Sequence, residues 1–549
     1  MEKQMVVGKY CYNNPIWSVI LSSFLFCFIY FLLDFSTLTR NHNFTFPNFL
    51  DIHQKPKPLS SYTSQTTNII NVPGNQTSTP ILTRNETKND HHDHESVHLH
   101  PAQSLNVTDN NMTQNGTTAT TNHFDSCSGR YIYIQDLPRQ FNEDLLNNCR
   151  IIEKSRDMCP FLSNEGFGTK LEDNDSKRVF TEKDWFLTSQ FSLEVIFHNR
   201  MKKYKCLTND SSMASGIFVP YYSGLDAAQY LLYNVSVRDA SAQKLVDFLA
   251  KRPEWKTMWG RDHFMIGGRV AWDYRRQTDN EKDWGSKLMF LPESKNMTLL
   301  SIESSLWNND IGIPYPTYFH PSKESVVFDW QERMRKRERR YLFSFAGAPR
   351  PGAEYSIRSE LINQCKSSTE HCKFMACDGS NNHCENPEKV MGLFQNSIFC
   401  LQPSGDSFTR RSTFDSILAG CIPVFFDPAS AYTQYLWHLP TNFSKYSVFI
   451  SKHDIKEKRV SISERLLGVP TDEIFEMQEE VTRMIPKIIY GNWTSGFERK
   501  LEDAFDIAVN GMLERVEKVR KKIKDGEDPS EGFGEVNNGK FDLLWKSLQ

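Results

Sequence analysis

Short apolar runs alternate with stretches of helical periodicity along the chain from about residue 126 onward. A short apolar run between turn residues is typical of a buried strand, and apolar residues three and four positions apart are typical of an amphipathic helix. The expected strands of this first series lie at residues 130–138, 215–226, 263–268 and 298–304, and the expected helices at 185–201, 227–233 and 241–249. This alternation predicts α/β layers with a parallel sheet.

A highly charged segment, residues 331–340, separates this series from a second one. We expect it to be an exposed helix end or an interdomain linker. The second series has expected strands from residues 341, 397 and 422, expected helices at 354–365 and 414–420, and a mostly helical stretch at 471–524. The predicted fold class is therefore α/β, with two doubly wound, Rossmann-like domains at 126–335 and 336–525 that face each other across a cleft, followed by a tail at 526–549.

One apolar run stands apart from these patterns. Residues 16–33 carry no charge, and about 18 to 20 apolar residues suffice to cross the hydrocarbon core of a bilayer. A cleaved signal peptide would have a shorter apolar region that ends in small residues, whereas this run ends in Phe31, Leu32 and Leu33. We therefore favour an uncleaved transmembrane signal-anchor, preceded by a cytoplasmic tail at residues 1–15.

The segment that follows the anchor, residues 34–125, is rich in Asn, Thr, Ser, Pro and His and has little apolar periodicity. Such a composition cannot bury enough apolar surface to offset the entropy of ordering, so we expect a disordered, glycosylated stem. Twelve N-x-Ser/Thr sequons and ten of the 12 cysteines follow the anchor. Both features suit an oxidising lumen and predict disulfides, whose pairing the sequence leaves open.

Composition narrows the class of protein further. Apolar residues make up 39% of the chain and charged residues 24%, which suits globular domains. The formal net charge is −3 at pH 7. A nucleic-acid-binding protein usually carries a basic footprint, so we expect no nucleic-acid partner.

The densest chemical signal lies at residues 397–427, where an apolar strand meets a Pro-Ser-Gly turn and a helix follows. Ligands of doubly wound sheets bind where strand carboxyl ends meet helix amino termini, which favour a diphosphate. Arg410 and Arg411 can add charge, and Asp415 can accept hydrogen bonds from ribose hydroxyls. The alternative is that Asp415 only favours the helix start and that the arginines are solvated. The candidate donor-binding residues of this segment are Ser404, Gly405, Arg410, Arg411 and Asp415.

A second glycine-containing turn follows the strand expected from residue 341. Gly347 allows a close approach of the backbone to a ligand, and Arg350 and Arg358 can reach a phosphate. A plain strand-to-helix turn explains Gly347 equally well. Gly347 and Arg350 are therefore further candidates for donor binding.

Four segments together resemble the exostosin-like glycosyltransferases, and among these the plant branch of xyloglucan galactosyltransferases. They read CSGRYIYIQDLPRQFN, GRDHFMIGGRVAWDYRR, FSFAGAPRPG and FCLQPSGDSFTRRSTFDSILAGCIPVFF. The resemblance spans about residues 127–506. It implies a GT-B fold, a single-pass type II protein of the Golgi membrane with a lumenal catalytic body, a UDP-sugar donor, and inversion at the anomeric carbon.

The same resemblance assigns a role to one residue. Asp415 matches the acidic residue that precedes the AGC turn of the family, and it would bind the ribose. Many exostosin relatives have an arginine three residues before that acid, where this chain has Ser412. Which of Arg410 and Arg411 reaches the diphosphate is left open.

An inverting transferase must stabilise the leaving diphosphate and deprotonate the acceptor hydroxyl. Asp262 and His263 precede a strand-like run in the first domain and are the candidate catalytic bases, although His263 also suits a packed or hydrogen-bonded role. Asp226 ends another expected strand. Trp272 and Asp273 are candidates for acceptor binding, with core packing as the alternative.

A metal-dependent transferase would use an Asp-x-Asp site. One such triplet, Asp173-Asn174-Asp175, overlaps a sequon and does not follow an apolar strand. We therefore expect it to be a surface loop, and we expect no essential metal or other cofactor.

Three functions remain open. The first is transfer of a sugar, galactose from UDP-galactose in the first instance, to xylosyl side chains of xyloglucan in cell-wall synthesis. The second is the same chemistry with another donor, such as UDP-galacturonic acid or UDP-arabinose. The third is a catalytically silent partner of other Golgi glycosyltransferases, which an intact site at Arg410, Arg411 and Asp415 disfavours.

Overall fold

A computed structural model describes residues 125–171, 179–181, 183–350, 352–353, 356–377, 383–493, 500–530 and 533. The expected cytoplasmic tail, apolar run 16–33 and stem lie outside these residues, apart from residue 125, as does the Asp173-Asn174-Asp175 triplet. Within the described part of the chain, no helix is both long and apolar enough to cross a membrane.

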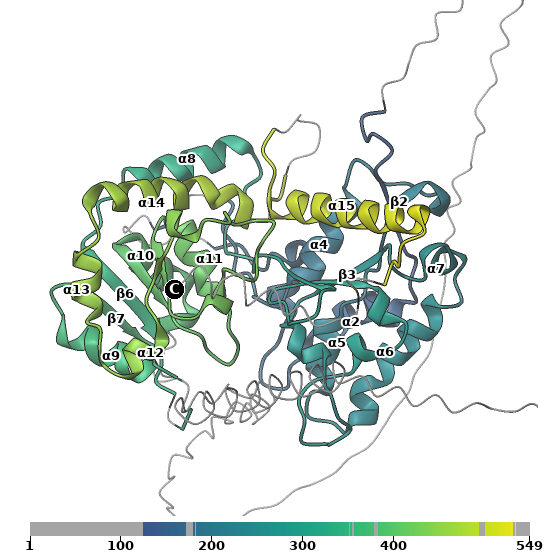
Figure 1. Ribbon diagram of the computed structural model, residues 1–549, viewed down its shortest axis with the longest axis horizontal. Coiled ribbons are helices and arrows are strands. Elements are labelled where there is room, and N and C mark those ends of the chain that lie inside the picture. The colour runs from purple at the N-terminus through teal and green to yellow at the C-terminus, as the bar shows by residue number, and fades with distance from the viewer. Residues whose placement is uncertain are drawn as a thin grey trace, which may run out of the picture. The chain divides into compact units, whose positions relative to one another are not determined.

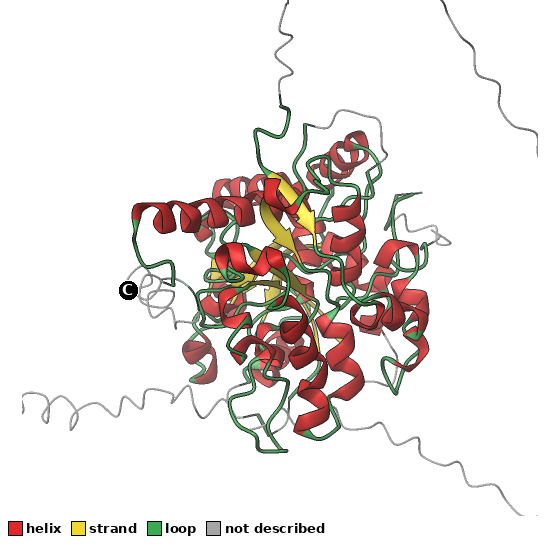
Figure 2. Cartoon of the chain, turned by 90° about the vertical axis from the view of Figure 1, so that its right-hand side faces the viewer, coloured by secondary structure: helices red, strands yellow, loops and turns green. Residues whose placement is uncertain are grey.

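The first sheet is parallel throughout and follows the chain order β1-β2-β3-β4-β5. Its strands are β1 (Tyr131–Ile134), β2 (Ala214–Phe218), β3 (His263–Gly267), β4 (Thr298–Ser301) and β5 (Asp310–Gly312). The helices of this half are α2 (Glu143–Asn147), α3 (Cys159–Leu162), α4 (Leu193–Lys202), α5 (Ser223–Tyr230), α6 (Val235–Leu249) and α7 (Pro253–Met258). Every residue of β3 and β4 is buried, as expected of central parallel strands covered on both faces. In Figure 2 the strands lie inside a shell of helices.

The second sheet is also parallel, and its order is β10-β9-β8-β6-β7. Its strands are β6 (Tyr341–Gly347), β7 (Cys372–Ala376), β8 (Ser397–Gln402), β9 (Ile422–Phe425) and β10 (Val448–Phe449). The helices are α8 (Glu324–Arg335), α9 (Arg358–Ser367), α10 (Pro387–Gln395), α11 (Arg411–Leu418), α12 (Lys452–Lys456), α13 (Ile462–Leu467) and α14 (Thr471–Met484). The chain leaves β6 for one edge and later returns to β8 on its other side. The carboxyl ends of β6 and β8 therefore form a topological switch point, where ligands of doubly wound sheets bind.

The long helix α15 (Ala504–Asp525) crosses from the second half of the molecule to the first (Figure 1). It packs on β2, and Arg515 Nε donates to Thr298 Oγ1 at 3.1 Å. The sequence-based boundary assigned residues 504–525 to the second domain, but this helix covers the first sheet.

Several expected elements differ in detail. Residues 185–192 are not helical, because Trp185 and Phe186 form isolated bridges with Phe319 and Lys170, and α4 begins only at Leu193. Their apolar spacing reflects burial in a tertiary contact rather than one helix face. The segment 331–340 is a helix end followed by a connection, as expected, but it is not fully exposed. Its Arg339 donates to the carbonyls of residues 394, 395, 397 and 419, and burial lowers the pKa of that guanidinium to about 10.

The ten cysteines after residue 34 form five disulfides, which confirms the prediction of disulfides. The pairs are Cys127–Cys206, Cys149–Cys159, Cys365–Cys372, Cys377–Cys384 and Cys400–Cys421. The last pair joins β8 to the residue before β9, and α11 lies between these two strands in the chain. It therefore anchors both ends of the segment with the densest chemical signal.

Candidate functional site

The carboxyl ends of the two sheets meet each other. Gln434, which follows β9, accepts hydrogen bonds at its side-chain oxygen from Ser304 N at 2.8 Å and Ser304 Oγ at 2.9 Å. The Tyr435 hydroxyl donates to the carbonyl of Ile302 at 2.8 Å. Ile302 and Ser304 follow β4, so loops from the ligand-binding edges of both sheets form one interface.

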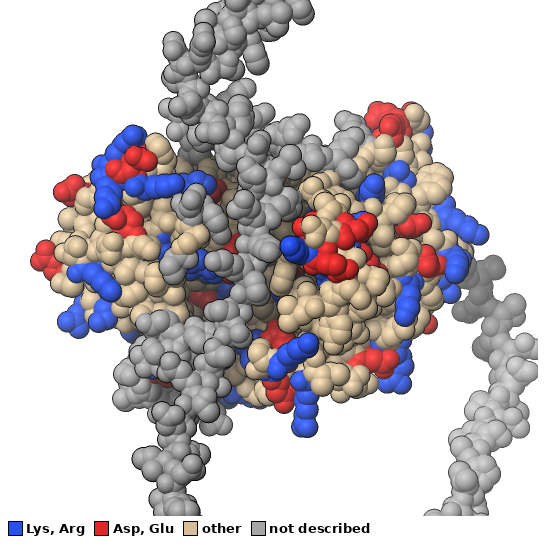
Figure 3. Space-filling model, turned by 90° about the horizontal axis from the view of Figure 1, so that it is seen from below, with Lys and Arg blue, Asp and Glu red and all other residues tan. Residues whose placement is uncertain are grey.

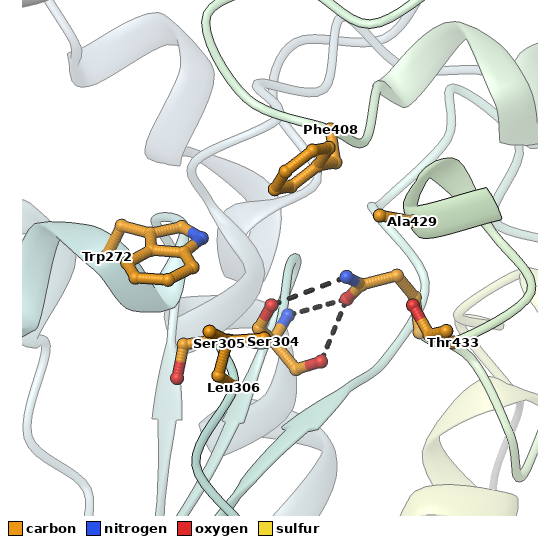
Figure 4. A pocket seen from close by; sticks show the side chains of 8 residues that line it. Trp272, Ser304, Ser305, Leu306, Phe408, Ala429 and Thr433 are labelled. Carbon is orange, nitrogen blue, oxygen red and sulfur yellow. Dashed lines mark hydrogen bonds between the residues drawn. The ribbon is translucent and has the colours of Figure 1, made fainter. Parts of the chain in front are cut away.

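A small pocket that is partly open to solvent lies at this interface, and the space in it that a water molecule can occupy is only about 10 Å³. It is lined by Trp272, Ser304, Ser305, Leu306, Phe408, Ala429, Thr433 and Gln434. Figure 4 shows Trp272 of the first half and Phe408 of the second on two sides of the pocket, with Ser304 below Phe408 in this view. Ser304 N donates to the side-chain oxygen of Gln434, which also lines the pocket. By the chemistry of its lining, although not by its volume in this structure, the pocket suits a sugar ring, which has apolar faces and a polar rim.

Arginines gather next to this pocket, at the switch point between β6 and β8. Arg350 follows β6 and pairs with Asp406, with Nη2 and Oδ2 at 2.7 Å. Arg358 Nε donates to the carbonyl of Ser404 at 3.2 Å. A Cβ atom at Gly405 would lie 1.6 Å from Arg410 Nη1, so a larger residue there would displace the end of the Arg410 side chain. Guanidinium groups at a helix amino terminus are suited to a diphosphate.

Figure 3 shows lysine and arginine interspersed with aspartate and glutamate on one face of the described residues. Such mixing keeps the long-range field small. An anion-binding site in this chain would therefore depend on a local cluster of arginines, such as the one at the switch point, rather than on net charge.

A second polar group lies on α11. Arg411 Nε is 3.5 Å from Asp415 Oδ2, and its guanidinium stacks 3.6 Å from the ring centre of Tyr318. Asp415 is only 3% exposed, and burial raises the pKa of its carboxyl to about 6, although Arg411 opposes this effect.

Several buried polar atoms of this group have no hydrogen-bond partner within the described ranges. They are Asp415 Oδ1, Arg411 Nε, Arg411 Nη2 and Gln402 Nε2. A buried polar atom without a partner is costly, and a hydroxyl-rich ligand such as a ribose would supply the missing bonds.

The candidate bases lie elsewhere. His263 is the first residue of β3, at the amino end of the strand, and is fully buried. Its Nδ1 is 2.8 Å from Asp262 Oδ1, and its ring packs edge-on against Trp255. The structure therefore does not bring Asp262 and His263 to the pocket, because the apolar run begins rather than ends at His263. Asp226 lies on α5, and its two oxygens accept from Tyr221 and Ser241.

The remaining candidate residues, for acceptor and donor binding, differ in what they contact. Asp273 accepts from Arg269 Nε at 2.6 Å and from Trp284 Nε1 at 2.8 Å, so both oxygens are engaged beside Trp272. Gly347 ends β6, where a Cβ atom would lie 2.4 Å from the ring of Phe345. Packing thus accounts for Gly347, whereas Arg350, Ser404, Gly405 and Arg410 are brought together as expected of a donor site.

Sequence reasoning missed Glu303. This residue lies two positions after the end of β4, is fully buried, and accepts hydrogen bonds from Thr409 N at 2.7 Å and Thr409 Oγ1 at 2.6 Å. Burial raises the pKa of its carboxyl, while the hydrogen bonds from Thr409 lower it. The available signal was a carboxylate placed where an apolar run of the first half ends.

Among the residues that the structure describes, we find no metal-binding cluster, that is, no group of three or more His, Cys, Asp or Glu side chains that could hold a metal ion.

Comparisons with known proteins agree with this geometry. The Exostosin GT47 domain matches residues 126–466. The chain is 52% identical to xyloglucan galactosyltransferase MUR3 of Arabidopsis thaliana over 77% of its own length and 68% of that protein. It is 53% identical to the probable xyloglucan galactosyltransferase GT14 of the same plant, over 71% of this chain and 75% of the relative. It is 42% identical to the xyloglucan-specific galacturonosyltransferase 1 of the same plant, over 72% of this chain and 58% of that relative.

Proposed function

The chain belongs to the exostosin GT47 family of glycosyltransferases, and from this premise we propose that it transfers galactose from UDP-galactose to xylosyl side chains of xyloglucan. The geometric observation that carries the proposal is the gathering of Arg350, Arg358 and Arg410 at the β6/β8 switch point, beside an aromatic pocket. The choice of sugar and acceptor is supported by relatives about 50% identical that are named xyloglucan galactosyltransferases.

The arrangement supports a division of labour between two facing sheets, as in the GT-B fold. The second half would hold UDP, with Asp415 on the ribose and the arginines on the diphosphate. The first half would present the acceptor through Trp272 in the pocket. Fixed positive charge near the diphosphate stabilises the negative charge that develops on the leaving group, so the reaction needs no essential metal in this proposal.

A second donor is the main alternative. A relative at 42% identity is named a xyloglucan-specific galacturonosyltransferase, whereas five relatives at 49–53% identity are named xyloglucan galactosyltransferases or probable ones. This difference in identity favours galactose over galacturonic acid.

We also propose that the enzyme is anchored in the Golgi membrane as a single-pass type II protein. The support is the uncharged run at 16–33, the sequons that follow it and the five disulfides of the described residues. Disulfides form and persist in an oxidising lumen rather than in the cytosol. Association with other Golgi glycosyltransferases remains compatible with this placement.

A donor screen with the purified full-length protein tests the function. UDP-galactose, UDP-galacturonic acid and UDP-arabinose would each be offered with xylosylated and unbranched glucan oligosaccharides. We expect UDP release only with UDP-galactose and a xylosylated acceptor. Preferred use of another donor would contradict the galactose assignment, and no consumption of any donor would contradict the enzyme itself. Activity lost in EDTA and restored by manganese would overturn the metal-free mechanism.

The acceptor role of Trp272 gives a further prediction. Replacing Trp272 by alanine is expected to raise the acceptor KM about ten-fold, because lost stacking and burial amount to roughly 1–2 kcal/mol. The donor KM should stay unchanged. Trp259 is a suitable control, because it is 53% exposed and lies before β3, at the opposite end of the strand. An equal rise in acceptor KM for Trp259→Ala would remove Trp272 from the acceptor site.

A further inference from the structure

We propose that Glu303 is a positioning residue, which holds Thr409 and through it sets one wall of the acceptor pocket and one arginine of the donor site at the same time. The inference rests on the proposed function in assigning these two sites. It concerns a fully buried carboxylate that is not itself among the residues lining the pocket.

The contact joins the two halves of the molecule. Glu303 follows β4 of the first sheet and Thr409 follows β8 of the second, 106 residues further along the chain. One carboxylate oxygen accepts from both the backbone N–H and the hydroxyl of Thr409, at 2.7 Å and 2.6 Å. The Tyr315 hydroxyl lies 3.0 Å from the same threonine hydroxyl. Thr409 is therefore fixed at its backbone and at its side chain.

The residues on either side of Thr409, Phe408 and Arg410, belong to the two proposed sites. Phe408 lines the pocket opposite Trp272 (Figure 4). Arg410 is the residue before α11 and closes on Gly405. Fixing one residue of a chain restricts the dihedral angles of the residues on either side. Glu303 therefore constrains Phe408 and Arg410 together, without touching either substrate.

The chemistry of the contact suits the precise placement of one loop better than it suits a general role in holding the two halves together. A buried carboxylate is costly to remove from water, and charge-assisted hydrogen bonds offset that cost only when their geometry is good. The halves are already joined nearby by neutral groups, as in the bonds between Gln434 and Ser304. A charged group adds short, directional bonds to one loop residue. Burial lowers the pKa of Arg410, and the Glu303 carboxylate is among the charges that oppose this effect.

The decisive experiment is a double-mutant cycle in the full-length protein with Glu303→Ala, Thr409→Val and the combined variant. The readouts are the dissociation constant of UDP, the KM for donor and acceptor, kcat, and the melting temperature. We expect Glu303→Ala to raise both KM values and the UDP dissociation constant about 10- to 100-fold, as loss of a charge-assisted hydrogen bond would. Since both groups act through one contact, the combined variant should be no more than about two-fold worse than the poorer single variant.

Glu303→Gln separates positioning from proton transfer. An amide oxygen can accept both bonds from Thr409, and the second carboxylate oxygen has no hydrogen-bond partner among the residues described. We expect Glu303→Gln to recover most of the substrate affinity and kcat. A Gln variant with normal UDP binding and a kcat as low as that of the Ala variant would overturn positioning in favour of a proton-transfer role.

Tyr490→Phe is the matched control. It removes a buried hydrogen bond from the Tyr490 hydroxyl to the carbonyl of Pro314, in a different loop. We expect a similar loss of melting temperature with unchanged KM values.

A cycle in which the effects of Glu303→Ala and Thr409→Val simply add would contradict the proposal, as would equal KM changes in Tyr490→Phe. If Glu303→Ala does not fold, the KM values and UDP affinities of Glu303→Gln and Thr409→Val still test the proposal. UDP binding reports on Glu303 even if the wild-type protein does not transfer galactose. A failure of the positioning role can therefore be distinguished from a failure of the proposed galactosyltransferase function.

Discussion

Replacing Asp415 by alanine is expected to raise the KM for the UDP-sugar by roughly 100- to 1,000-fold. Two charge-assisted hydrogen bonds that ribose hydroxyls donate to a carboxylate contribute about 3–4 kcal/mol together. Asp415 is the acid on α11, nearly buried, with one oxygen that lacks a partner among the described residues. The orphaned atoms of Arg411 and Gln402 beside it would contact the same ligand. Donor titrations at saturating acceptor would measure the change.

The pH dependence of donor binding gives an independent readout of the same residue. Burial raises the pKa of Asp415 to about 6, and the ionised form accepts hydrogen bonds best. The wild-type donor KM should therefore rise as the pH falls through about 6, and Asp415→Asn should lose this dependence. The exposed Asp472, in the first turn of α14, is a control carboxylate of the same half. Unchanged donor kinetics in Asp415→Ala would remove Asp415 from the site.

The grouping of the residues of the proposed donor site was predictable because they are local in sequence. Ser404, Gly405 and Arg410 lie within one strand-turn-helix unit, whose turn residues and apolar strand mark where a ligand would bind. Arg350 belongs to the neighbouring unit of the same kind. Their convergence follows from the parallel pairing of β6 with β8. The alternation of strands and helices predicts a parallel sheet but not this pairing.

The surroundings of the proposed acceptor site were less predictable, because they depend on contacts between distant segments. His263 was proposed as a base because a strand-like run adjoins it, but pattern alone does not tell whether a residue enters or leaves the sheet. The strand direction places His263 at the end opposite to the pocket. Glu303 gains its importance only from Thr409, in another sheet. Likewise, the amphipathic pattern of α15 predicts a helix but not that its apolar face covers β2.

Replacing Arg200 by methionine is expected to lower the free energy of unfolding by about 3–5 kcal/mol, the cost of leaving one partner of a buried ion pair alone. Arg200 lies on α4, and its Nη1 is 3.0 Å from Asp503 Oδ2. Asp503 is fully buried and caps α15 through the backbone N–H groups of Phe505 and Asp506. The guanidinium also donates to the carbonyl of Gly491 and lies 4.8 Å from the ring centre of Phe505.

Urea and thermal unfolding of Arg200→Met would measure this loss, and Arg520→Ala is the matched control. Arg520 belongs to α15 and also donates to backbone carbonyls, those of Ala214 and Ser215, but it is exposed, so we expect a loss below about 1 kcal/mol. Equal stability of the two variants would show that the ion pair does not hold α15 in place. Since α15 is the helix that returns from the second half to cover the first sheet, a large loss in Arg200→Met alone would identify this buried pair as a main link between the two halves.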